Sequence, residues 1–87
     1  MRIRWLQAAF RDLNKATDFI SLENTQAAED FVAAVHSSVA QLVEYPYIGR
    51  NGRVPGTREL VVSGAPYIIP YRIRGEVIEI VRVYHAA

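Results

Sequence analysis

The sequence contains no cysteine, which excludes disulfide bonds and thiolate metal sites. Its two histidines, His36 and His85, stand far apart without an evident third ligand, so we expect no metal and no cofactor. There is no apolar run of signal-peptide length and none of the roughly 20 residues needed to span a bilayer. We therefore expect a cytoplasmic protein that makes no membrane contact and is held together by noncovalent packing alone.

Length and charge narrow the possibilities further. Eighty-seven residues leave room for one domain, 1–87, with one small core. Residues 1–49 hold four basic and six acidic side chains, whereas residues 50–87 hold six arginines and three glutamates. This asymmetry indicates an anionic partner for the C-terminal half, either nucleic acid or an acidic protein segment. A solvated strand face is an equally good explanation.

The first half of the chain carries the spacing of one strand and two helices. Residues 2–6 alternate polar and apolar side chains, which predicts a short strand. Apolar residues recur every three or four positions over 8–21 and again from about residue 25 to Glu44, which predicts two helices in an antiparallel hairpin. We expect the aromatic residues of this half to pack in the core: Trp5, Phe10, Phe19 and Phe31. His36 falls on the polar side of the second helix and is expected at the surface.

The second half reads as a loop followed by three strands. Proline and glycine dominate 45–56, and apolar, β-branched runs follow at 59–63, 66–73 and 77–84, separated by short turns. The predicted order β-α-α-β-β-β is an α+β fold, in which the helical hairpin packs on a small, mainly antiparallel sheet and the first strand joins that sheet. Pro70 cannot donate to a strand ladder, so it predicts a bulge or an edge position.

Side-chain alternation places the candidate chemistry on the last two strands. In a regular strand Glu79, Val81, Val83 and His85 share one side, while Arg82 and Tyr84 share the other unless the strand bulges. Arg72 and Arg74 share the face opposite Tyr71. Guanidinium groups bind phosphate, tyrosine rings stack on bases, and a histidine moves protons at neutral pH, which together suit metal-free RNA cleavage. A histidine after an apolar strand is more often structural, and His85 stays open between these roles.

Three blocks of the C-terminal half resemble a known family: Gly52-Arg-Val-Pro-Gly-Thr-Arg-Glu-Leu60, Pro66-Tyr-Ile-Ile-Pro-Tyr-Arg-Ile73 and Ile78-Glu-Ile-Val-Arg-Val-Tyr-His85. With the helical hairpin before them, they are similar to the RelE/ParE superfamily of type II toxin-antitoxin toxins. The resemblance implies the fold of the superfamily and an activity that arrests growth. It also implies a cognate antitoxin, whose acidic, hydrophobic segment folds onto the toxin so that the two proteins form a hetero-oligomer.

The superfamily holds two activities, cleavage of ribosome-bound mRNA by RelE-like members and poisoning of DNA gyrase by ParE-like members. A nuclease is the first hypothesis, with His85 as general acid or base, although Ile68 follows Tyr67 where RelE-like members tend to have arginine. The predicted catalytic residues are Arg58, Arg72, Arg82 and His85, and the predicted substrate-binding residues are Arg53, Tyr71, Arg74 and Tyr84. The alternatives are a gyrase inhibitor without catalytic residues and an inactive relic that only binds its antitoxin.

Overall fold

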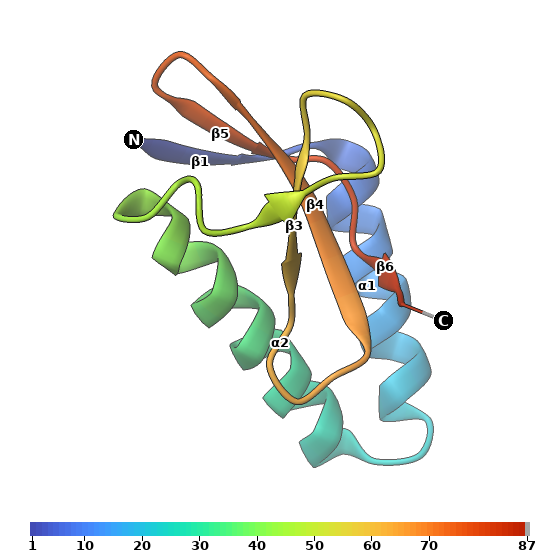
Figure 1. Ribbon diagram of the computed structural model, residues 1–87. Coiled ribbons are helices and arrows are strands. Elements are labelled where there is room, and N and C mark those ends of the chain that lie inside the picture. The colour runs from blue at the N-terminus through green and yellow to red at the C-terminus, as the bar shows by residue number, and fades with distance from the viewer. Residues whose placement is uncertain (87) are drawn as a thin grey trace.

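The computed structural model describes residues 1–86, and these form two helices packed on a six-stranded sheet (Figure 1). The α+β architecture and the element order predicted from the sequence are confirmed. The elements are β1 (Arg2–Trp5), α1 (Gln7–Ser21), α2 (Thr25–Ala40), a short 3-10 helix (Gln41–Val43), β2 (Arg50–Asn51), β3 (Arg58–Val61), β4 (Tyr67–Arg74), β5 (Val77–Ile80) and β6 (Tyr84–His85). Neither helix within residues 1–86 is long and apolar enough to cross a membrane.

The sheet joins the first strand to the predicted meander. Its order is β1-β5-β4-β3-β2, and β6 pairs with β4. All pairings are antiparallel except that between β1 and β5, which is parallel. This parallel pair is possible because the two strands are far apart in sequence, with both helices between them. The two-residue strand β2, inside the predicted loop, was not foreseen.

The helical hairpin covers one face of the sheet, here called the inner face (Figure 1). Asn24 caps α2 by accepting a hydrogen bond from the Ala27 N–H at 3.0 Å, which fixes where the second helix begins. Alternate residues of β4, including Ile69 and Tyr71, point to the inner face and are fully buried. Ile78 and Ile80 of β5 lie beside them, and the face turned away from the helices is called the outer face.

The predicted aromatic core is wrong for two of its four members. The buried stripe of α1 consists of Ala9, Leu13 and Ala16, while Phe10 and Phe19 are 55% and 71% exposed. At about 100° per residue these two rings stand roughly 90° to either side of that stripe. They therefore flank the contact with the sheet instead of entering it. Of the other two, Phe31 is buried and Trp5 is partly buried against the core.

A one-residue bulge interrupts the strand predicted over 77–84. Ile80 pairs with Tyr71 and Tyr84 pairs with Ile68, so four steps along this segment oppose three steps along β4. The Val81 N–H donates to the Pro70 carbonyl oxygen at 2.9 Å inside the bulge. Pro70 predicted a bulge or an edge position; the extra residue lies on the segment that faces Pro70, while β4 itself keeps its register with β3 there. The bulge reverses the side-chain alternation downstream.

Candidate functional site

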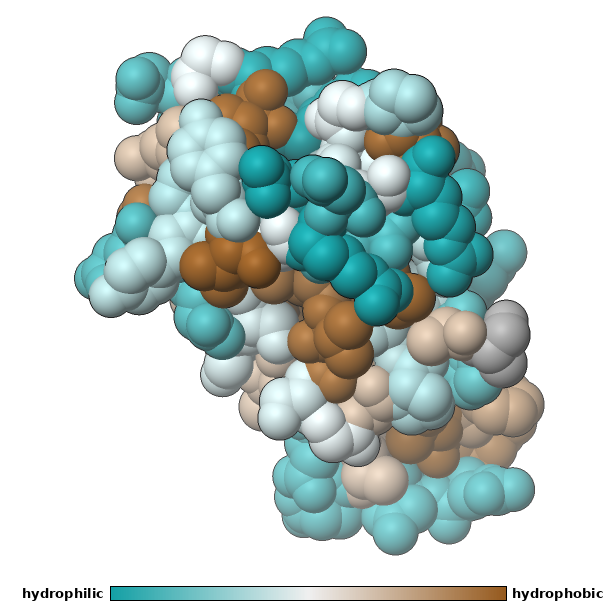
Figure 2. All heavy atoms as spheres, in the orientation of Figure 1, coloured by the Kyte–Doolittle hydropathy of each residue, from teal (hydrophilic) through white to brown (hydrophobic). Residues whose placement is uncertain are grey.

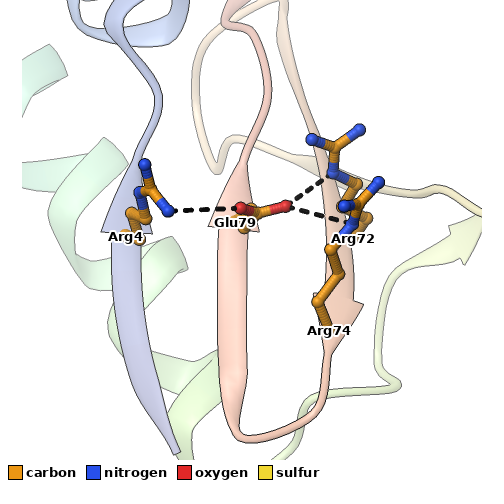
Figure 3. Close-up of polar contacts among 4 residues, drawn as sticks. All are labelled: Arg4, Arg72, Arg74 and Glu79. Carbon is orange, nitrogen blue, oxygen red and sulfur yellow. Dashed lines mark hydrogen bonds and ion pairs between the residues drawn. The ribbon is translucent and has the colours of Figure 1, made fainter.

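A buried carboxylate organises the arginines of the outer face. Glu79 lies between β1 and β4, and its Oε1 accepts a hydrogen bond from Arg72 Nε at 2.7 Å (Figure 3). Arg74 Nε lies 3.4 Å from the same oxygen, and Arg4 Nη1 lies 3.8 Å from Oε2. The hydrogen bond from Arg72 holds the pKa of Glu79 below its usual range, against the opposing effect of burial, and the three positive charges add to it. Glu79 thus holds the predicted residues Arg72 and Arg74 close together through ion pairs.

A second buried carboxylate, Glu59, holds the loop that precedes β3. Its Oε1 accepts from Arg50 Nε at 3.3 Å, and its Oε2 accepts from the backbone N–H of Arg53 at 3.1 Å. The predicted substrate contact Arg53 therefore uses its main chain for the loop while its side chain stays exposed. Through these two hydrogen bonds, Glu59 fixes the conformation of the proline- and glycine-rich loop.

Arg58 and Tyr71 anchor the other end of the same loop. Arg58 Nη1 donates to the carbonyl oxygens of Tyr47 and Gly49 at 3.1 and 2.8 Å, and its guanidinium carbon lies 5.2 Å from the centroid of the Tyr47 ring. The Tyr71 hydroxyl donates to the Pro46 carbonyl at 2.7 Å and accepts from the Gly49 N–H at 2.9 Å. Burial raises the pKa of Tyr71, against the lowering effect of the Gly49 N–H and of Arg58.

Tyr71 was predicted to bind substrate, and its side chain is fully buried beside the cavity that it lines. Its ring has no exposed surface on which a base could stack. The hydroxyl donates one hydrogen bond to the loop and accepts another from it, so Tyr71 acts as a structural latch that holds the loop in place. Tyr84 pairs with Ile68 and so shares the outer face, where it is partly exposed.

Arg82, the third predicted catalytic arginine, is bound to helix α1. Its Nε and Nη2 donate to the two carboxylate oxygens of Asp12 at 2.6 and 3.0 Å, and the Val83 N–H also donates to Asp12. Burial would raise the pKa of Asp12, but these hydrogen bonds, together with the charges of Arg82 and Lys15, bring it below its usual value. This bidentate pair fixes the bulge against the helix instead of leaving the guanidinium for a phosphate.

His85 lies apart from the arginines. It pairs with Tyr67, with the two rings edge to face at 5.3 Å between centroids, and both line a cavity of about 550 Å³ with Phe19 and Phe31. Because of the bulge, His85 shares the inner face with Tyr67, and the expected grouping with Glu79 is wrong. Arg72 stands five residues along β4 from Tyr67, about 16 Å at roughly 3.3 Å per residue, and on the opposite face.

Only part of the predicted site is therefore assembled. Three predicted residues, Arg58, Tyr71 and Arg72, line one cavity of about 310 Å³, while Arg82 and His85 lie elsewhere. The carboxylates that organise the arginines were missed: Asp12, Glu59 and Glu79. A signal was present for two of them, because an isolated glutamate within an apolar strand run requires a cationic partner when buried.

The surface also carries exposed apolar residues around the loop after α2. Figure 2 shows hydrophobic patches set among hydrophilic side chains on one face of the molecule. The exposed large apolar residues here are Val43 at the end of the 3-10 helix and, in the segment after it, Tyr45, Tyr47, Ile48 and Val54. Such a patch, fixed by Glu59, Arg58 and Tyr71, is suited to bind another protein.

Comparison with known proteins gives consistent matches. Residues 3–87 match the family model described as the ParE toxin of the type II toxin-antitoxin system parDE. The chain is 47% identical over 85 residues to toxin Y4kP of Sinorhizobium fredii, covering 98% of this chain and 88% of that protein. It is 34% identical over 86 residues to toxin RelE2 of Caulobacter vibrioides, covering 99% and 96%. A solved structure titled as the chromosomal ParDE system from P. aeruginosa superposes with a TM-score of 0.88 at 29% identity, covering 100% of this chain and 97% of that one.

Proposed function

Because the chain belongs to the ParE toxin family of type II toxin-antitoxin systems, we propose that it arrests growth by binding and inhibiting DNA gyrase, without cleaving RNA. Its partner in the resting state is an antitoxin, as membership of a type II system implies. The gyrase target is the activity that the superfamily resemblance assigns to ParE-like members.

The observation that carries this proposal is the engagement of the arginines. Arg72 is hydrogen-bonded to Glu79, Arg82 to Asp12, and Arg58 to two backbone carbonyls. A ribonuclease site needs cationic groups aimed at one phosphate with a proton donor beside them. Here the histidine lies on the other face of the sheet from Arg72, which favours a protein-binding toxin over a nuclease.

The second candidate function is ribosome-dependent mRNA cleavage. It is supported by the 34% identity to a protein named toxin RelE2 and by the exposure of His85, which lines a cavity. In this case His85 serves as general acid or base, and Arg58 and Arg72 bind phosphate across their shared cavity. Substrate binding would have to bring these two regions together.

The experiment induces the toxin in cells, maps new 5′ ends of mRNA, and scores the SOS response in the same culture. Gyrase inhibition predicts a strong SOS response with intact message, and purified toxin then inhibits DNA supercoiling by gyrase. New 5′ ends at ribosome-occupied codons without SOS would overturn the proposal and establish the nuclease.

The substitution His85→Gln tests the two candidates at residue level, and His36→Gln is its control. His36 is exposed on α2, and within residues 1–86 its one aromatic ring contact is with Trp5. A binding toxin keeps its toxicity in both variants. A nuclease that uses His85 for proton transfer loses on the order of 10²–10⁴-fold in cleavage rate in the first variant alone.

A further inference from the structure

A cavity of about 310 Å³ lies between segment 44–57 and strand β4, and it is lined by Arg58, Arg72 and the exposed Tyr47. Arg58 is held through Nη1 by two backbone carbonyls, and Arg72 is held through Nε by a carboxylate. Within residues 1–86 the other N–H groups of both guanidiniums have no hydrogen-bond partner. The cavity therefore presents fixed positive charge and free donors, an arrangement that suits a carboxylate.

Segment 44–57 also carries four large apolar side chains at the surface. Their exposed fractions range from 47% to 64%, and they are Tyr45, Tyr47, Ile48 and Val54. Tyr47 lines the cavity, and the Val54 carbonyl accepts hydrogen bonds from Thr57, which also lines it. Exposed apolar side chains beside arginines are typical of protein interfaces, in which tyrosine and arginine carry much of the binding energy. The composition of this surface therefore indicates a protein partner.

The conformation of segment 44–57 is fixed by its main chain, which leaves the side chains free to bind. Tyr71 and Arg58 hold the backbone of residues 46–49, as described above. Farther along, the Gly52 N–H donates to the Thr57 carbonyl at 2.8 Å. A Cβ added at Gly52 would collide with Thr57 Oγ1 and lie 3.0 Å from the Thr57 carbonyl oxygen. A surface ordered before binding loses less conformational entropy when the partner arrives.

We propose that segment 44–57 and the cavity form the surface through which the toxin binds gyrase, in the conformation that the segment has in the free toxin. An acidic side chain of gyrase enters the cavity and pairs with the free N–H groups of Arg58 and Arg72. Apolar side chains of gyrase pack against Tyr47 and Ile48. This inference rests on the proposed function, because gyrase is the target named there.

The charge of this surface favours an acidic protein over other occupants. Segment 44–57 and the cavity lining hold four arginines, and Glu44 is their one acidic residue. The buried Glu59 and Glu79 offset part of this charge, and the surface remains positive. A second copy of the chain is disfavoured, because a twofold contact would place these arginines against each other. Nucleic acid is disfavoured, because the exposed aliphatic side chains would meet charged phosphates.

The first test compares Tyr47→Ala with Leu22→Ala. Both side chains are exposed, at 64% and 83%, but Leu22 lies at the end of α1 and outside the proposed surface. The measurement is the toxin concentration that half-inhibits DNA supercoiling by purified gyrase, with urea denaturation to confirm folding. Tyr47→Ala should raise this concentration on the order of thirtyfold, as truncation of a central interface residue does. Leu22→Ala should leave it unchanged. Equal inhibition by the two variants overturns the proposal.

The second test compares Arg72→Gln with Arg4→Gln. Both arginines contact Glu79, but Arg72 lines the cavity whereas Arg4 lies on β1 beside a different depression. Arg72→Gln should weaken gyrase inhibition on the order of tenfold, the loss expected for a charge-assisted hydrogen bond. Arg4→Gln should change it by less than about twofold. An equal loss in both variants would reduce the effect to general electrostatics and overturn the proposal.

A third variant, Gly52→Ala, disturbs the loop without removing any side chain that would contact gyrase. It should weaken inhibition about two- to tenfold, because a loop that must be reordered on binding loses conformational entropy. Unchanged inhibition overturns binding in the conformation of the free toxin.

The native toxin separates this proposal from the proposed function. If native toxin neither binds nor inhibits gyrase, the proposed function fails, and the partner assigned to this surface fails with it. If native toxin inhibits gyrase and both Tyr47→Ala and Arg72→Gln inhibit it equally well, only the surface is wrong. Binding of labelled duplex DNA by toxin without gyrase, lost in Tyr47→Ala, would assign the surface to nucleic acid and overturn the proposal.

Discussion

The two faces of the sheet are held by different interactions, although residues next to each other in the sequence contribute to both. On β5, Ile78 points to the inner face and is fully buried under the helices, while Glu79, the next residue, points to the outer face among three arginines. The inner face is sealed by apolar packing, which is not directional. The outer face is ordered by ion pairs and hydrogen bonds, which fix side-chain directions.

This difference separates stability from recognition. A small domain buries little surface, so its stability depends on the apolar residues that are fully buried on the inner face. Exposed or half-exposed ion pairs add little to stability, and the outer face can therefore place its charges for partners. The bulge between β5 and β6 places His85 on the inner face and leaves Glu79 on the outer face.

The largest effect is expected from truncating the inner face. Ile78→Ala should lower the free energy of unfolding by about 2–5 kcal/mol, the cost of removing buried methyl groups and leaving a cavity. Urea denaturation of the purified toxin measures it. Val61→Ala serves as control, because Val61 is 58% exposed on the outer face of β3; a change beyond about 0.5 kcal/mol there would contradict the contrast between the faces.

An intermediate effect is expected where the inner face holds the loop. Tyr71→Phe keeps the packed ring but removes the hydroxyl shared by the Pro46 carbonyl and the Gly49 N–H. Leaving these groups without partners should cost about 1–3 kcal/mol of unfolding free energy. Tyr45→Phe, in the exposed part of the same loop, should be neutral. Equal stability of both variants would show that the loop does not depend on the latch.

The smallest effect is expected at the ion pair that ties the bulge to α1. Asp12→Asn weakens the contacts to Arg82 and the Val83 N–H and should cost about 1 kcal/mol at neutral pH, given its partial exposure. The folded state lowers the pKa of Asp12 from its ordinary 3.8, so its contribution is present above that value and is lost as pH falls through the lower folded pKa.

The stability difference between the native protein and Asp12→Asn should therefore begin to shrink below about pH 4 and vanish once the pH is below the lowered pKa of folded Asp12. Thermal denaturation across pH 2 to 7 measures this, with Asp18→Asn as a control from the exposed side of the same helix. A stability difference that stays constant down to pH 2 would mean that the carboxylate charge of Asp12 is not what holds the bulge.

Local patterns in the sequence determined the elements and the fold class. Apolar spacing located both helices and β-branched runs located the strands, because each depends on residues close together in the chain. The same patterns failed for Phe10 and Phe19, which have the hydrophobicity of core residues but stand to either side of the stripe that meets the sheet.

Only the tertiary structure decided which charges meet. The parallel pairing of β1 with β5 places Arg4 beside Glu79, and the pairing of β6 with β4 fixes the extra residue that turns His85 to the inner face. Register between distant strands is set by the packing of the whole sheet, and a one-residue slip reverses every later side chain. The sequence by itself therefore determined what kind of protein this is, and the tertiary structure decided where its charged surface lies.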